Sequence, residues 1–255
     1  MPQLLRACVR WVPVMLAGLG VASGCSSARR LTVSLLPPAL PTVSMIASAP
    51  TAVLWSEDFD TLDVKRWREV ELRRQTRYEI VEHDGQRCLR AQSRDGASIL
   101  LAAVKFNPER YPWISWRWRI EQPVAQEALD RKDGSDTAAR VYVYFDSRGL
   151  PWQKRNIDYV WSVRQPVDTI LTSAFASTSK IVVADSGMAT VGKWRVIERN
   201  LSDDYRRIFG EPAPRVVAIG LMTDTDTMGG EAMAYYDALR IGHEPLLTHA
   251  MEASP

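Results

Sequence analysis

The chain has 255 residues, of which 46% are hydrophobic and 24% charged. This composition is typical of a globular protein and excludes a chain that is disordered throughout. The formal net charge is only +2 and there are three His residues, so neither a nucleic-acid-binding surface nor a His-based metal site or triad is expected.

The first predicted element is a bacterial export signal over residues 1–24. Arg6 and Arg10 supply its positive start, and the apolar stretch that follows is too short to span a bilayer. Small residues then precede Cys25, as at a bacterial lipid-attachment site, and Ser26 does not resemble an inner-membrane retention signal. We therefore expect a lipoprotein that faces the periplasm, is anchored through Cys25 and has no other membrane contact, with the outer membrane favoured. The alternative is ordinary signal cleavage.

Residues 25–52 are rich in Ser, Ala and Pro, which predicts a disordered, extended tether between membrane and domain. After export only Cys88 would remain as a free thiol, so no intrachain disulfide is expected. Cys88 lies in a strand-like stretch and is interpreted as a small buried residue.

From residue 53 to residue 244, short runs of β-branched and aromatic residues recur between Gly, Pro, Asp and Asn. This pattern predicts an all-β domain: an antiparallel β-sandwich of jelly-roll type with one short helix, followed by a C-terminal tail over 245–255. The helix is expected near 201–210, with Ser202 as N-cap and Gly210 at its end. Strands are expected near 53–59, 77–83, 87–93, 98–104, 113–121, 139–146, 157–163, 180–184, 193–201, 215–223 and 234–242.

Two strands alternate clearly between apolar and polar residues. In 114–120 (ISWRWRI), we assign Trp116 and Trp118 to the core. In 140–146 (RVYVYFD), we assign the two valines and the phenylalanine to the core. We interpret the opposite sides as one polar groove on a single sheet face, able to bind a carboxylated or hydroxylated ligand such as a carbohydrate or another envelope polymer. Its members are Arg117, Arg119, Arg140, Tyr142 and Tyr144. The alternative is a solvated outer face on which Arg stems cover apolar surface.

Asp224 and Asp226 form a second candidate group, within 223–230 (TDTDTMGG). Two acids two residues apart at a strand end can point the same way, bind a cation, or pair with the arginines of the groove. They are also candidates for the paired carboxylates of a polysaccharide hydrolase. A turn in which Asp and Thr cap backbone groups is favoured over catalysis, and no catalytic residue is assigned.

Several motifs stand in an order that resembles one bacterial family. They are 111–119 (YPWISWRWR), 138–143 (AARVYV), 158–162 (DYVWS), 222–227 (MTDTDT) and 234–237 (AYYD). The chain resembles, over about residues 55 to 242, the family catalogued as domain of unknown function 3047. The resemblance implies an exported domain without an assigned activity.

The chain is also similar, more weakly, to galactose-binding-like jelly rolls, which include many carbohydrate-binding modules. The similarity lies in an acidic opening strand, 56–60 (SEDFD), and in the closing strand, 235–241 (YYDALRI). It implies that the two ends of the domain lie side by side and that acids there hold a structural calcium, which would be the only cofactor. The candidate ligands are Glu57, Asp58 and Asp237; the alternative is that these acids face water.

These features favour a non-catalytic ligand-binding or envelope-surface module. Two alternatives remain open: a polysaccharide hydrolase that uses Asp224 and Asp226, and a purely structural envelope protein with exposed apolar patches. Nothing in the sequence indicates an oligomer.

Overall fold

The computed structural model describes residues 53–147 and 154–245. The predicted signal, Cys25, the tether and nearly all of the C-terminal tail lie outside these ranges. Within them, no helix has both the length and the apolar character that crossing a membrane requires.

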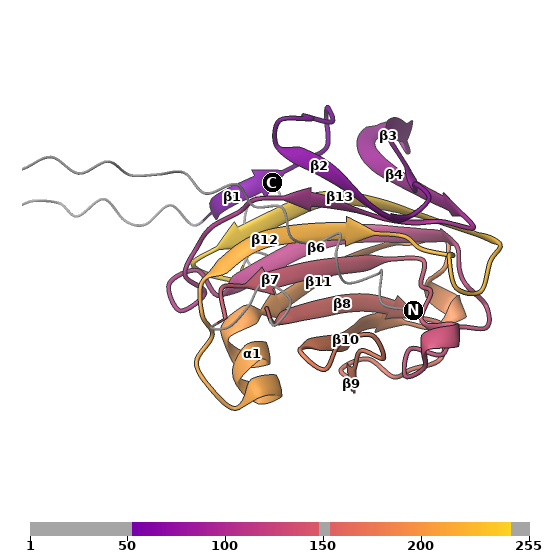
Figure 1. Cartoon of the computed structure of the whole chain (residues 1–255). Helices are drawn as coiled ribbons and strands as arrows, with labels where there is room; N and C mark the ends of the chain where they lie inside the picture. The colour runs from indigo at the N-terminus through magenta and orange to yellow at the C-terminus, as the bar shows by residue number, and fades with distance from the viewer. Residues whose placement is uncertain (1–52, 148–153, 246–255) are drawn as a thin grey trace, which may run out of the picture. The chain divides into compact units, whose positions relative to one another are not determined.

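The described chain forms two β-sheets that share one core (Figure 1). Sheet A has the order β11-β6-β13-β4-β3, with β1 also paired to β13, and sheet B has the order β2-β5-β12-β7-β8-β10-β9. Sheet A consists of β1 (Val53–Glu57), β3 (Arg77–His83), β4 (Gln86–Arg94), β6 (Trp113–Gln122), β11 (Trp194–Asn200) and β13 (Glu231–Gly242). Sheet B consists of β2 (Trp67–Arg73), β5 (Ala97–Ala102), β7 (Arg140–Phe145), β8 (Asn156–Ser162), β9 (Ile170–Thr172), β10 (Ser179–Ser186) and β12 (Val216–Met222).

This architecture confirms the predicted all-β sandwich with one short helix. The first and last strands are neighbours, as the second resemblance implied, because Glu57 of β1 pairs with Leu239 of β13. One strand pair departs from the antiparallel expectation: β8 and β10 are parallel, because the chain leaves β8, forms β9 at the sheet edge and returns between the two. Sequence analysis missed β2, whose charged residues dilute its pattern, and β9, which has only three residues.

The core consists of the inward sides of the two sheets. Trp116 and Trp118 of β6 are almost fully buried, as predicted, and their rings lie edge to face at 5.4 Å. Val141 and Phe145 of β7 are fully buried opposite them, in the same apolar cluster. Cys88 is also buried, as expected.

The hydroxyl of a buried tyrosine helps to join the two sheets through this core. Tyr236 of β13 reaches sheet B, where its hydroxyl donates to the Met222 carbonyl at 2.6 Å and accepts from the Arg140 amide at 3.2 Å. The hydroxyl also lies 3.1 Å from Thr223 Oγ1.

We predict that Tyr236→Phe lowers the free energy of unfolding by about 1–3 kcal/mol, because it leaves buried backbone groups unpaired. Urea unfolding measures the change. The matched control is Tyr235→Phe, one residue earlier on the outward side of β13, which should change stability by less than about 0.5 kcal/mol. Equal losses in the two variants would contradict the role given to the Tyr236 hydroxyl.

The single α-helix, α1 (Leu201–Phe209), follows β11 directly. Its N-cap is Asn200 rather than the predicted Ser202: the Asn200 side chain accepts from the Asp203 amide at 3.1 Å, and Ser202 donates to Glu109 at 2.7 Å. Gly210 ends the helix in the left-handed conformation, at φ 74°, as predicted. Two short 3-10 turns, Lys132–Gly134 and Met188–Thr190, complete the described elements.

Candidate ligand-binding face

The five residues predicted to share one groove lie on two different sheets. Arg117 and Arg119 belong to β6 in sheet A, whereas Arg140, Tyr142 and Tyr144 belong to β7 in sheet B. All five point away from the core, as the alternation predicted. Because the two sheets face each other across that core, their outward sides point in opposite directions. The prediction of a single shared face is therefore wrong.

Arg117 on sheet A is occupied by neighbours of its own sheet. Its Nε lies 2.8 Å from the Asp237 carboxylate, and its guanidinium also contacts the Gln86 side chain. The same guanidinium lies over the Trp194 ring, at 4.7 Å from the centroid. These contacts satisfy the charge of Arg117 within the protein.

The tip of the β3–β4 hairpin folds over this part of sheet A. Asp84, at the tip, lies 3.5 Å from Arg119, and the His83 ring lies 4.6 Å from the Tyr235 ring and 6.2 Å from that of Trp194. The hairpin therefore covers the outward side of β6 and β13 here, and this face is less open to a ligand than the sequence suggested.

The acids proposed as calcium ligands do not converge. Glu57 accepts from the Trp67 indole at 2.9 Å, on the core side of sheet A. Asp58 forms an ion pair with Arg240, and Asp237 is held by the β6 arginine described above. Among the described residues these three acids form no group with metal-ligand spacing. The calcium prediction at this place is therefore wrong, because each carboxylate has a separate protein partner.

On sheet B, the outward side of β7 carries a stacked aromatic pair. β7 is the central strand of the seven, and the rings of Tyr142 and Tyr144 lie 5.7 Å apart with 16° between their planes. Next to them on β12 stand Gly220 and Ala218. A side chain at Gly220 would not fit, because its Cβ would lie 2.9 Å from Ile99. The tyrosine rings thus border the small residues of β12, and the side chains of Ile99 and Leu101 of β5 fill the space above Gly220.

Polar side chains of β8 flank the tyrosines on the other side. Asp158 is the cross-strand neighbour of Tyr142, and Asn156 is that of Tyr144. The Asp158 carboxylate accepts from Asn156 and, at 3.2 Å, from Ser179 of β10. Although Asp158 points away from the core, it is only 2% exposed. The loop before β7 covers this part of the outward face of sheet B, since Leu129 packs on Val160 and Ile181 there.

Arg140 lies at one end of the same face and is 5% exposed. Its guanidinium contacts the Asp224 carboxylate at 3.2 Å, the Asp158 carboxylate at 3.9 Å and the Ser135 carbonyl. Burial alone would lower the pKa of Arg140, but the neighbouring acidic groups, Asp224 first among them, together outweigh it and the pKa is raised. Burial also raises the pKa of both carboxyls to about 7, against the influence of Arg140.

Two further acids extend this group. Carboxylate oxygens of Asp136, Asp224 and Asp226 lie within 4.8 Å of one another. Asp136 accepts from the amides of Thr227 and Met228, which fixes the loop after β12. Burial and the charge of Asp136 raise the pKa of Asp226. Three carboxylates supply only part of the six to eight oxygens that calcium takes.

Asp224 has a structural role of the kind that the sequence favoured over catalysis. It is 4% exposed, accepts from the Thr137 amide at 3.2 Å and pairs with Arg140. The neighbouring Thr223 hydroxyl donates to the Ala138 carbonyl at 2.7 Å. The loop before β7 is thus joined to the end of β12 by side chains of both segments.

Sequence analysis missed several members of this face. Asn156 and Asp158 alternate with Ile157 and Tyr159 in β8, so the period-two argument applied to β7 would have placed them on the outward side. Asp136 lies in a loop, where no local pattern indicates that it meets the end of β12.

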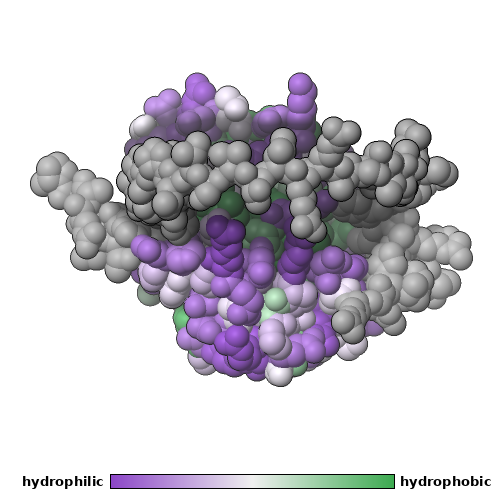
Figure 2. Space-filling model, turned by 90° about the vertical axis from the view of Figure 1, so that its left-hand side faces the viewer, coloured by the Kyte–Doolittle hydropathy of each residue, from purple (hydrophilic) through white to green (hydrophobic). Residues whose placement is uncertain are grey.

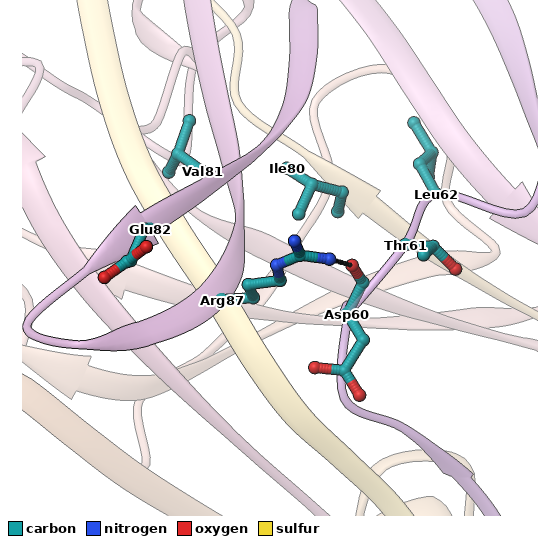
Figure 3. Close-up of a pocket in the computed structure, with 7 residues that line it drawn as sticks. All are labelled: Asp60, Thr61, Leu62, Ile80, Val81, Glu82 and Arg87. Carbon is teal, nitrogen blue, oxygen red and sulfur yellow. Dashed lines mark hydrogen bonds between the residues drawn. The ribbon is translucent and has the colours of Figure 1, made fainter.

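Elsewhere the described surface offers less. A shallow hollow of about 450 Å³ lies between the segment after β1 and the β3–β4 hairpin, where Arg87 donates to the Asp60 carbonyl at 3.0 Å (Figure 3). Figure 2 shows mostly hydrophilic side chains around α1. The most exposed large hydrophobic residues, Val64 and Phe175, lie in separate loops.

Comparison with known proteins bears on the fold. A family model described as "Protein of unknown function (DUF3047)" matches residues 65–240. No curated protein matches the chain in sequence.

Several solved structures are similar in fold. One is a tandem of family 22 carbohydrate-binding modules from Paenibacillus barcinonensis Xyn10C, which is 12% identical with a TM-score of 0.38. The match covers 77% of this chain and 51% of the tandem. "Cellulose induced protein, Cip1" is 9% identical, with a TM-score of 0.47, over 74% of this chain and 97% of Cip1. TmCBM61, in complex with β-1,4-galactotriose, is 12% identical, with a TM-score of 0.34, over 73% of this chain and 94% of TmCBM61.

Proposed function

The chain belongs to the DUF3047 family of proteins of unknown function, and on that premise we propose that its sandwich is a ligand-binding module. The proposed site is the outward face of sheet B around Tyr142 and Tyr144. The ligand is a hydroxylated polymer, with carbohydrate as the class.

One observation carries this proposal: two nearly parallel tyrosine rings lie side by side on the central strand, beside an apolar cluster that includes Ile99, Leu101 and Met222. Tyrosine supplies a large, rigid contact area together with a polar tip. A sugar ring has an apolar face that can pack on such rings and hydroxyls that need partners at its rim. Asn156 and Asp158, on the next strand, are groups of the kind that bind hydroxyls.

The polar groups beside the tyrosines are held in place. Binding sites for small molecules have few polar groups at defined positions. Arg140 and Asp158 are held rigidly by ion pairs and hydrogen bonds, so the face is organised before a ligand arrives. Preorganisation of this kind reduces the entropic cost of binding.

The test is a binding measurement on the domain from residue 53 onward with soluble xylan, β-glucan and galactan, by affinity electrophoresis and calorimetry. We predict that Tyr142→Ala and Tyr144→Ala each weaken binding at least about tenfold, through the loss of a stacked ring. Circular dichroism shows whether each variant is folded.

The matched control is Trp194→Ala, which removes an aromatic ring from the outward side of sheet A. It should leave the affinity unchanged. If Trp194→Ala abolishes binding and the tyrosine variants do not, the ligand binds the opposite face and the proposed site is wrong.

We also propose that the module works at the bacterial envelope, exported and anchored by a lipid on Cys25. Support comes from the sequence alone: a positive start, a short apolar stretch and small residues before the cysteine. Metabolic labelling with a fatty acid should mark the full chain but not its Cys25→Ser variant. Equal labelling of both, or of neither, would contradict the anchor.

A further inference from the structure

The face proposed to bind carbohydrate has an excess of negative charge. Among the described residues, Arg140 is the only cation that contacts the carboxylates of Asp158 and Asp224, and it is shared between them. Tyr142 interacts electrostatically with all three of these residues. The charges therefore act at the tyrosine pair and not only at the end of the sheet.

A further carboxylate adds to this excess. Glu127, in the loop that precedes β7, is 5% exposed and interacts electrostatically with Arg140. Its Oε1 accepts from the Ser162 hydroxyl and, at 2.7 Å, from the Val163 amide. Within the described part of the chain its buried Oε2 has no hydrogen-bond partner. Arg73 of β2 supplies a second positive charge, which acts on Asp226, so among the described residues the carboxylates of this face still outnumber the cations.

Asp226 is the member of the group that a ligand can reach. It is half-buried, whereas Asp136 and Asp224 beside it are buried. Arg73 of β2 donates at 2.8 Å to the backbone carbonyl of Asp226, and its charge also acts on the Asp226 carboxylate. Met222, which accepts from the Tyr142 hydroxyl at 3.4 Å, lies on the strand that leads into this group. The accessible acid is thus continuous with the aromatic face.

We propose, on the basis of the function proposed above, that this face selects amino sugars: glycans whose ammonium groups lie at Asp226 while their rings pack on the tyrosines. An ammonium supplies hydrogen-bond donors and the opposite charge, whereas a carboxylated glycan would meet like charge, which is costly where water is excluded. The sequence alone had suggested a carboxylated ligand, because Arg117 and Arg119 were counted with this face.

The experiment compares three hexasaccharide probes at the same pH and at low salt. They are a glucosamine hexamer, the N-acetylated hexamer with the same backbone, and a galacturonate hexamer. We expect the glucosamine hexamer to bind at least about tenfold more tightly than its acetylated counterpart, with an advantage that decreases as salt is added, and we expect the galacturonate hexamer to bind most weakly.

The variant that tests the mechanism is Asp226→Asn, which removes one charge and preserves the shape of the side chain. It should abolish the preference for the glucosamine hexamer and leave the affinity for the acetylated hexamer unchanged. Asp203→Asn, on the exposed side of α1, is the control and should preserve the preference.

Three outcomes separate this inference from the function on which it rests. Equal binding of the two glucosamine-based hexamers, or tighter binding of galacturonate, overturns the amino-sugar inference and leaves the tyrosine site intact. A preference that survives Asp226→Asn overturns the role of that residue. Absence of binding by every probe and every neutral polysaccharide overturns the proposed function itself, and the inference with it.

Discussion

Replacement of Arg140 by Met is expected to lower the free energy of unfolding by about 3–5 kcal/mol at neutral pH. Arg140 is 5% exposed and, within the part of the chain that the structure describes, its guanidinium is the only cation in contact with Asp158 and Asp224. Without it, two buried carboxylates must either carry uncompensated charge or take up protons. The Ser135 carbonyl loses its donor as well. Urea or thermal unfolding of the domain measures the loss.

The matched control is Arg119→Met, on the outward side of sheet A. Arg119 also has two acidic partners, Glu121 at 2.9 Å and Asp84 at 3.5 Å, but Asp84 is largely exposed. Exposed ion pairs contribute little, so this variant should lose no more than about 1 kcal/mol. If the two variants lose the same stability, the burial of Arg140 does not determine its contribution to the free energy of unfolding, and Arg140 is not the ion-pair partner on which this face depends.

Sequence analysis predicted which side chains point inward but not which strands share a sheet. Alternation is a local property, so it assigned Trp116 and Val141 to the core correctly. Whether β6 and β7 belong to one sheet depends on the strands with which each pairs. β6 pairs with β13, about a hundred or more residues later in the chain, and β7 pairs with β12, about seventy residues later. Arg117 and Arg140 were therefore placed together although they lie on opposite sides of the molecule.

The acids illustrate the same limit. The pairing of Asp224 with Arg140 was among the contacts expected, since a strand-end acid near an outward arginine is a plausible ion pair. Asp136 joins them only because the loop before β7 crosses the end of β12, which no local pattern encodes. The calcium prediction for Glu57 and Asp237 followed from the adjacency of the first and last strands, which was correct. The assignment of Glu57 and Asp237 as ligands of one ion was wrong, because the two carboxylates point to opposite sides of sheet A.

The stability of the domain is expected to decrease as the pH rises from about 4 to about 8. Burial raises the pKa of Asp158 and of Asp224 from the ordinary value of 3.8 to about 7 in the folded protein. Between these values the folded state binds more protons than the unfolded state, so each unit of pH increase favours unfolding. The stabilisation by these groups is complete below about pH 4 and is lost as the pH passes through about 7, with a total effect on the order of a few kcal/mol.

The double variant Asp158→Asn, Asp224→Asn tests this assignment, because asparagine keeps the shape of the side chain and does not titrate. Its unfolding free energy should depend far less on pH across this range than that of the unaltered domain. Arg140→Met should respond in the opposite way: loss of the guanidinium raises both carboxyl pKa values further, so its stability deficit should be larger at pH 8 than at about pH 5.5. A deficit that is independent of pH would mean that the two carboxylates keep their charge without Arg140, and the electrostatic coupling inferred for this face would not exist.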